Sequence, residues 1–243
     1  MSGESGSTEL SSTQRVRQFL AARFDPKSQL GLGLTASLVI LGLAIWTLSG
    51  LLEAVLDNEL LVRTDVAIES WLHGHATPTG LTIFNAITQL GSPVVDVIAV
   101  VVALYLWRKH EMLLLWNWLG AIFGGKALEY VLKSTVHRSR PQYGATYLNG
   151  HSYSFPSGHA MGATVCYLLL AYFIASRSDA TSTTRLVVFS AAATIIVAVA
   201  FSRLYLGVHY PSDVLGGIAA GVAWLAVCGA TRRFVAVRFE TSP

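Results

Sequence analysis

Long stretches without a charged side chain alternate with short polar segments along this chain. A helix needs about 20 mainly apolar residues to cross the hydrocarbon core of a membrane. The first and last stretches approach that length unaided, and the others reach it when flanking residues are included. The pattern predicts an all-α fold, a single-domain bundle of six transmembrane helices. The charge-free stretches cover residues 28–52, 97–107, 112–125, 160–176, 186–202 and 214–231.

Composition agrees with a membrane protein. Hydrophobic residues make up 53% of the chain and charged residues only 13%, against about 25% charged residues in an average soluble domain. The mean hydropathy is +0.52. We therefore expect the lipid bilayer as a partner, and no nucleic acid.

Both ends of the chain are more polar than its middle. Residues 1–14 are mostly Ser, Gly, Thr and Glu, which is typical of a disordered tail, and residues 15–27 place apolar side chains at helical spacing among basic ones. We predict that residues 1–28 form this tail and an amphipathic helix on the membrane surface. Residues 29–231 then form the six-helix membrane domain, and residues 232–243 a cytoplasmic C-terminal tail.

The segment between the first two predicted spans is acidic. Five carboxylates and a single basic residue, Arg63, lie within Glu53–Gly80, which predicts a solvated loop or an interfacial helix. Residues 81–90 have the pattern of another short helix, and Ser92–Pro93 then supply the N-cap and first-turn proline of the second span. We expect these short interfacial helices on the outer side of the membrane.

The distribution of Lys and Arg predicts how the chain is oriented. Eleven of them lie in the N-terminal tail, the 108–110 and 177–185 turns and the C-terminal end, and five lie in the alternate segments. By the positive-inside rule, both termini are cytoplasmic in a multi-pass protein of the plasma (inner) membrane. Residues 133–141, 154–159 and 203–213 then lie together on the outer face.

Candidate chemistry begins with residues 154–159, Ser-Phe-Pro-Ser-Gly-His. Pro, Ser and Gly before an apolar run are typical of a helix start. The N-terminus of a helix can hold a phosphate with its free N–H groups and partial positive charge, and His159 would lie beside that anion in the first turn. A plain helix cap followed by a lone interfacial histidine explains this stretch equally well.

The other two stretches carry charged or nucleophilic side chains. Lys133 and Arg140 follow a helix end before Pro141 and can clamp a phosphate, although basic residues at a helix end also snorkel without any such role. In the second stretch Asp213 follows His209 by four residues. Asp213 can therefore hold one ring nitrogen as N–H and leave the other as a nucleophile.

Together the three stretches resemble the signature of the type 2 phosphatidic acid phosphatase superfamily, in its six-helix integral membrane branch. Its three motifs recur here in order, residue type and spacing, over roughly residues 80–230, with no key position substituted. They are Lys133-x6-Arg140-Pro141, Pro156-Ser157-Gly158-His159 and Ser202-Arg203-x5-His209-x3-Asp213.

The resemblance implies a metal-independent phosphomonoesterase or diphosphatase that needs no cofactor and forms a phosphohistidine intermediate. By carry-over, His209 attacks the phosphorus atom, Asp213 orients it, and His159 protonates the leaving oxygen and then activates water. Because the two histidines need opposite protonation states, activity is expected to fall at both pH extremes. The resemblance assigns the phosphoryl oxygens to Lys133, Arg140, Ser157, Gly158 and Arg203.

A site on the outer membrane face favours a lipid substrate. The candidates are phosphatidylglycerophosphate, phosphatidic acid, lysophosphatidic acid and polyprenyl diphosphates. The alternative is a non-catalytic or transport-type membrane relative that binds lipid phosphates, against which the intact His159, His209 and Asp213 argue.

Two further charges lie within the third predicted span. Lys126 and Glu129 are ionisable, and intramembrane charges usually face the interior of a bundle and pair. Their spacing allows a mutual pair, and Glu129 also precedes Lys133 by four residues. We predict that Glu129 orients Lys133 at the phosphate site, and simple snorkelling of Lys126 and Glu129 is the alternative.

Overall fold

The computed structural model describes residues 31–142, 153–177 and 179–240, with side chains up to residue 235. The described chain is all-α, as predicted, and the tail and amphipathic helix predicted for residues 1–28 lie outside it. The helices are α2 (Leu32–Asp57), α3 (Glu59–Gly74), α4 (Pro78–Thr88), the 3-10 helix η1 (Gln89–Gly91), α5 (Pro93–Arg108), α6 (Met112–Val136), α7 (Gly158–Ala175), α8 (Ser182–Tyr205) and α9 (Pro211–Glu240).

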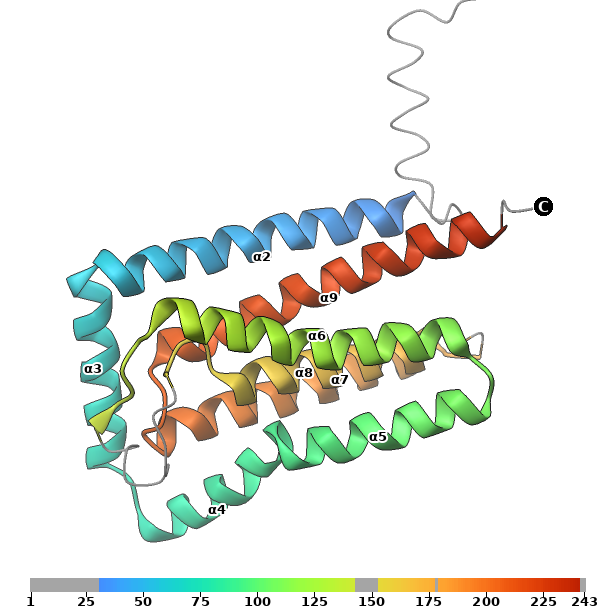
Figure 1. The fold of residues 1–243 in the computed structure, drawn as a ribbon. Coiled ribbons are helices and arrows are strands. Elements are labelled where there is room, and N and C mark those ends of the chain that lie inside the picture. Colours follow the sequence, from blue (N-terminus) through green and yellow to red (C-terminus); the bar gives the residue numbers. More distant parts are fainter. Residues whose placement is uncertain (1–30, 143–152, 178, 241–243) are drawn as a thin grey trace, which may run out of the picture.

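The long helices lie side by side in a bundle, and α3 crosses one end of it (Figure 1). α2 runs along α9 on one side, and α4, η1 and α5 follow one another on the opposite side. α7 lies in the centre, with buried residues around its whole circumference, which is typical of a helix surrounded by others. Fully buried Trp118, Ala163, Cys166 and Val199 form part of the core between α6, α7 and α8.

Small residues let α9 approach α7 closely. A Cβ atom at Gly217 would lie 2.5 Å from Ser157 O, and one at Gly221 would lie 3.0 Å from Thr164 Cβ. Because both positions are glycine, the two backbones meet without a side chain between them. The contact brings the starts of the two helices together, where Ser157 N donates to Asp213 O over 2.9 Å.

Among the described residues, five helical stretches are long and apolar enough to cross a membrane. α6 has 25 residues and is not among them, since Lys126 and Glu129 interrupt its apolar stretch. Length and composition therefore mark five of the six predicted spans. The five stretches are Leu32–Asp57, Pro78–Arg108, Gly158–Ala175, Ser182–Tyr205 and Pro211–Val235.

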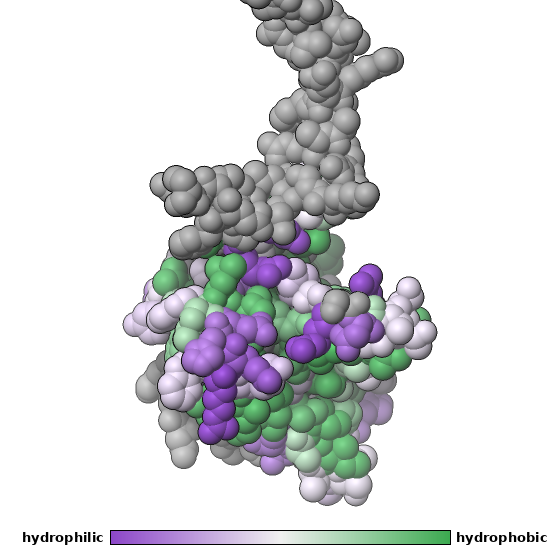
Figure 2. Space-filling view, turned by 90° about the vertical axis from the view of Figure 1, so that its right-hand side faces the viewer, coloured by the Kyte–Doolittle hydropathy of each residue, from purple (hydrophilic) through white to green (hydrophobic). Residues whose placement is uncertain are grey.

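The two ends of the bundle differ. α2 begins and α9 ends at one end, whereas α3 and the loops with the candidate site residues lie at the other (Figure 1). Figure 2 shows the first end, where polar side chains gather among apolar ones. Exposed Arg108, Lys109 and Arg177 lie in the helix turns of this end. The side of the membrane that each end faces stays a prediction.

The acidic segment is helical, in keeping with the second of its two predicted forms, but it is not solvated throughout. It forms α3, whose Asp65 and Glu69 are only 1% and 4% exposed, so these two carboxylates are not solvated. These carboxylates are buried because α3 packs across the end of the bundle (Figure 1), and they lie on the face of α3 that the bundle covers. At the other terminus α9 continues to Glu240, so residues 232–240 of the predicted C-terminal tail are helical.

Candidate active site

The three sequence stretches meet at the α3 end of the bundle. A cavity of about 230 Å³ at this end is lined by six of the eight residues predicted for catalysis and phosphate binding. The other two, Ser157 and Asp213, are buried next to it. The six lining residues are Lys133, Arg140, Gly158, His159, Arg203 and His209.

His209 lies in the turn between α8 and α9 and is 1% exposed. Gly207 takes a φ of 63° in this turn, a conformation that glycine adopts readily. His209 Nε2 lies 3.2 Å from Arg140 Nη1, and Nδ1 lies 3.5 Å from Asp213 Oδ2. The second distance is longer than an ordinary hydrogen bond, so Asp213 faces the ring without closing a short bond to it.

The environment of His209 keeps its ring unprotonated. The pKa of His209 is lowered to about 4, chiefly by burial and also by the nearby Arg140 and Arg203, while Asp213 raises it and offsets part of the effect. A neutral imidazole is the form that can attack a phosphorus atom. The side chain therefore has the protonation state of a nucleophile at neutral pH.

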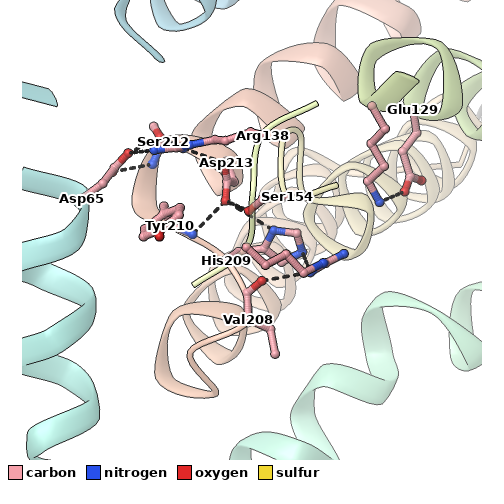
Figure 3. A network of polar contacts seen from close by, with 11 residues as sticks. Asp65, Glu129, Arg138, Ser154, Val208, His209, Tyr210, Ser212 and Asp213 are labelled. Carbon is pink, nitrogen blue, oxygen red and sulfur yellow. Dashed lines mark hydrogen bonds and ion pairs between the residues drawn. The ribbon is translucent and has the colours of Figure 1, made fainter. Parts of the chain in front are cut away.

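Asp213 lies in the first turn of α9 and has no exposed surface. Its Oδ1 atom accepts a hydrogen bond from Arg138 Nη1 over 2.7 Å. Its Oδ2 atom accepts from Tyr210 N over 2.8 Å and from Ser154 Oγ (Figure 3). These donors fix the carboxylate in one orientation, with Oδ2 towards His209.

Glu129 holds Lys133 at the cavity. The two residues are one helical turn apart on α6, and Lys133 Nζ donates to Glu129 Oε1 over 2.6 Å. The same carboxylate lies against the start of α7, where a Cβ atom at Gly158 would be 2.0 Å from Oε1. Glycine at this position therefore leaves room for Glu129. Lys126 bonds Asp96 over 2.6 Å, rather than forming the pair with Glu129 that its spacing allows.

The two arginines of the cavity come from different parts of the chain. Arg140 Nη1 donates to Val208 O over 2.9 Å. Arg203, at the end of α8, is 6% exposed and donates from Nη1 to Thr88 Oγ1 over 2.7 Å. Within the described part of the chain, Arg203 Nε has no hydrogen-bond partner. Guanidinium groups placed in this way can supply several donors to one phosphoryl group.

The start of α7 contributes a hydroxyl group and the second histidine. Ser157 is the N-cap residue, but its side chain does not cap the helix, and among the described residues its buried Oγ has no hydrogen-bond partner. A hydroxyl that is not used for capping can donate to a phosphoryl oxygen. His159 follows in the first turn and lines the cavity, together with Gly158.

Four residues of the site are missing from the sequence-based prediction: Asp65, Thr88, Arg138 and Ser154. In the sequence analysis Arg138 enters only the count of basic residues on the outer side, although it lies two positions before Arg140 in the same segment. Ser154 begins the stretch that contains Ser157. This proximity is the only feature of the sequence that points to a role for Ser154 in the site. Nothing in the local pattern around Asp65 or Thr88 points to the site, because both reach it from other elements.

The arrangement defines a class of enzyme. A buried, unprotonated histidine beside a fixed carboxylate, with a second histidine and three cations in one cavity, suits transfer of a phosphoryl group. Its place at the end of a bundle of membrane-length helices makes the protein an integral membrane phosphatase. Residues 114–235 match the family model of the PAP2 superfamily. The chain belongs to this family and is a lipid phosphate phosphatase.

A protein sequence and a crystal structure from Bacillus subtilis match most of this chain, and a mycobacterial protein matches less than half of it. Phosphatidylglycerophosphatase B of Bacillus subtilis is 35% identical over 173 residues, which is 70% of this chain and 77% of that protein. A crystal structure of a transmembrane PAP2 type phosphatidylglycerolphosphate phosphatase from Bacillus subtilis has a TM-score of 0.64 at 25% identity, and the match covers 85% of this chain and 97% of that one. Decaprenylphosphoryl-5-phosphoribose phosphatase of Mycobacterium tuberculosis is 36% identical over 102 residues, 41% of this chain and 50% of that protein.

Proposed function

We propose that this protein removes the terminal phosphate of phosphatidylglycerophosphate in the plasma membrane through a phosphohistidine intermediate. The observation that carries the proposal is the cavity in which His209 and three cations meet. The choice of substrate is supported by the Bacillus subtilis relative named phosphatidylglycerophosphatase B, which matches over 77% of its length. A polyprenyl-linked phosphate is the second candidate, and the mycobacterial relative favours it.

In the first chemical step, His209 Nε2 attacks the phosphorus atom of the phosphomonoester. The N–P bond forms while the bond between phosphorus and the lipid oxygen breaks, and His159 gives that oxygen a proton so that the lipid leaves as an alcohol. Asp213 faces Nδ1 at 3.5 Å and stabilises the positive phospho-imidazole.

In the second step, His159 accepts a proton from water while the water oxygen attacks phosphorus. The N–P bond breaks, inorganic phosphate leaves, and His209 returns to its neutral form. Catalysis of phosphoryl transfer consists mainly of positioning and charge stabilisation. We assign the phosphoryl oxygens to Lys133, Arg140, Arg203, the Ser157 hydroxyl and the Gly158 N–H.

The position of the cavity supports a lipid substrate. Besides the phosphate-binding groups, its lining includes Gly91 at the end of η1, Val95 in the first turn of α5 and Gly162 on α7. These positions lie on helices whose apolar stretches are long enough to span a membrane. A lipid can therefore present its phosphate to His209 while its glycerol and acyl parts lie along α5 and α7.

We propose that the cations of the cavity act in place of a metal ion. A hard divalent cation requires several oxygen ligands, and the two carboxylates that line the cavity are each bonded to a lysine, Glu129 to Lys133 and Asp96 to Lys126. Phosphate release should therefore persist in a chelator, and vanadate should inhibit it by imitating the five-coordinate phosphorus. Loss of activity in chelator that magnesium restores would contradict this mechanism.

We further propose that α6 is the sixth span, with both termini cytoplasmic and the cavity on the outer face. α6 lies within the bundle (Figure 1), and the pairing of Lys126 with Asp96 and of Glu129 with Lys133 lowers the cost of placing these charges in a membrane. Single cysteines at Gly74 and Lys109, in a Cys166→Ala, Cys228→Ala background, test the orientation. An impermeant maleimide should label position 74 and not position 109 in intact cells, and the reverse result contradicts the proposal.

Phosphate release from a panel of lipids tests the function. The detergent-purified protein is expected to hydrolyse phosphatidylglycerophosphate with a higher kcat/KM than phosphatidic acid, lysophosphatidic acid or a polyprenyl diphosphate. A preference for the polyprenyl substrate would favour the second candidate. Binding of lipid phosphates with no release from any of them would favour a non-catalytic or transport-type relative.

A further inference from the structure

α3 turns one face into the end of the bundle that holds the active site. Asp65 on this face is 1% exposed, whereas the side chain of Glu59, on the same helix, is 84% exposed. Burial of a carboxylate is unfavourable unless the group is paired and hydrogen-bonded. The partners of Asp65 lie on the segments that carry the catalytic groups.

Asp65 holds the start of α9. Its Oδ1 atom accepts from Ser212 N over 3.1 Å, and its Oδ2 atom accepts from Ser212 Oγ. The first N–H groups of a helix have no partner inside the helix. A carboxylate from α3 therefore does here what an N-cap side chain does in other helices, and it does so directly beside Asp213.

Arg138 bridges Asp65 and Asp213 (Figure 3). Its Nη2 atom donates to Asp65 Oδ2 over 2.8 Å, and its Nη1 atom donates to Asp213 Oδ1 over 2.7 Å. The guanidinium carbon also lies 4.4 Å from the centroid of the Tyr210 ring, and the side chain is only 10% exposed. The planar fork of arginine can make both bonds at once, which the single ammonium group of lysine does with poorer geometry.

The bridge preserves negative charge beside His209. If Arg138 paired with Asp213 alone, the two charges would cancel and the carboxylate would do little for a cationic imidazole. Because Asp65 shares the same guanidinium, two carboxylates and one cation leave a net charge of −1. That charge faces His209 Nδ1, where Asp213 Oδ2 lies 3.5 Å away.

We propose that Asp65 and Arg138 are positioning residues of the reaction, which hold Asp213 towards His209 and maintain the negative charge that stabilises the phosphohistidine. Neither residue lines the cavity, so neither touches the substrate. α3, which carries none of the three motifs, thereby becomes part of the catalytic apparatus. The inference rests on the proposed role of Asp213.

Kinetics of Asp65→Asn, Arg138→Gln and the double variant test the proposal with phosphatidylglycerophosphate as the substrate. Each single variant should lower kcat on the order of 10- to 10²-fold, the usual effect of misplacing a catalytic group slightly. KM should change less than about twofold, because the phosphate-binding groups are intact. The loss in the double variant should be smaller than the product of the two single losses, since Arg138 joins Asp65 to Asp213.

The pH profile separates this role from a purely structural one. Asp65→Asn removes a negative charge near His209, so the low-pH limb of kcat/KM should move to lower pH. Arg138→Gln removes a positive charge, so the limb should move to higher pH. Ionisation of the substrate is the same for every variant and cancels in the comparison. The other charged or titratable groups that face His209 also stay the same, namely Asp213 of α9, Arg140 after α6, Arg203 of α8 and His159 of α7.

Glu59→Gln is the matched control, because Glu59 lies on the exposed side of α3, paired with Arg63. It should have wild-type kinetics. Folded Asp65→Asn protein with wild-type kcat, or with an unmoved pH limb, would overturn the proposal.

Two further variants distinguish failure of this proposal from misfolding of Arg138→Gln and from a wrong assignment of Asp213. If Arg138→Gln does not yield monodisperse protein, Arg138→Lys replaces it. That variant keeps the charge but cannot hold both carboxylates in the same geometry, so its kcat should fall, and wild-type kcat would again overturn the proposal. Asp213→Asn with wild-type turnover would show instead that the proposed role of Asp213 is wrong.

Discussion

The two sides of His209 use the same kinds of side chain but balance charge differently. On the α3 side, Arg138 lies between the carboxylates of Asp65 and Asp213, so negative charge is in excess. On the cavity side, Lys133, Arg140 and Arg203 lie near the histidine and Glu129 pairs with Lys133, and cations outnumber carboxylates among the described residues that line the cavity. A bound phosphate would add negative charge to this second side.

This difference indicates which interactions change during the reaction. An excess of positive charge favours the binding of an anion, and a phosphate dianion supplies both negative charge and hydrogen-bond acceptors for these cations. Changes on the cavity side should therefore affect substrate binding as well as turnover. Changes on the α3 side should affect turnover alone.

The largest effect is expected at His209 itself, where the two sides meet. His209→Ala removes the nucleophile and should abolish both phosphate release and any trapped phosphoenzyme. Mass spectrometry of the phosphate retained on base-quenched protein checks this outcome. Phosphate on residue 159 of the wild-type protein, or on the His209→Ala variant, would mean that the roles of the two histidines are reversed.

His159→Ala should have the next largest effect. Loss of the general acid and base should slow turnover of lipid substrates on the order of 10²- to 10⁴-fold. With p-nitrophenyl phosphate, whose leaving group needs no proton, the phosphoenzyme should still form and then hydrolyse slowly. A rapid-quench time course would show this as a burst of nitrophenol. An equal loss with both substrates would contradict the assignment of His159 as the acid.

Glu129→Gln tests the carboxylate on the cavity side of His209. Glu129 holds Lys133 over 2.6 Å, so the variant should lower kcat/KM on the order of 10-fold as the lysine loses its fixed position. Glu111→Gln is a suitable control, because Glu111 is exposed next to the opposite end of α6. Wild-type phosphate release from Glu129→Gln would end the idea that Glu129 orients Lys133.

The contacts of the site that could be predicted from residue spacing are local, and the grouping of the three stretches followed from the family resemblance. His209 and Asp213 are four residues apart, as are Glu129 and Lys133, and a helix or tight turn brings such pairs together. The apolar runs likewise mark individual helices. α6 is the exception, because Lys126 and Glu129 lower its hydropathy and only its place in the bundle groups it with the others.

The α3 side could not be predicted because its contacts depend on how distant elements pack. Asp65 and Arg138 are 73 residues apart, and their contact requires α3 to cross the end of the bundle. A run of acidic residues with little basic charge reads as solvated, since local sequence contains no sign of the guanidinium that pairs with it. Hydrophobic periodicity predicts that a segment is a helix. It does not predict which charged residue of another element will contact one face of that helix.

The smallest effect is expected from mild acid. The protein needs an unprotonated His209, and burial lowers the pKa of this residue to about 4. About 10% of a group with that pKa is protonated at pH 5, whereas an ordinary histidine, with a pKa of about 6.5, would be almost fully protonated. Acidification from pH 7 to 5 should therefore remove only about a tenth of the reactive form, and steep loss should follow near and below pH 4.

Nuclear magnetic resonance of ring-labelled histidine in the detergent-purified protein measures this titration directly. The spectrum of His209→Gln assigns the signal, and the absence of substrate removes the ionisation of the phosphate group from the measurement. As the pH falls, the ring should gain its proton only near pH 4, because a buried imidazolium beside Arg140 and Arg203 is unfavourable and Asp213 compensates only in part. A midpoint near 6.5 would contradict this reasoning. It would mean that water from the cavity solvates the ring, or that Asp213 and the charge shared through Arg138 act on it more strongly than the cations.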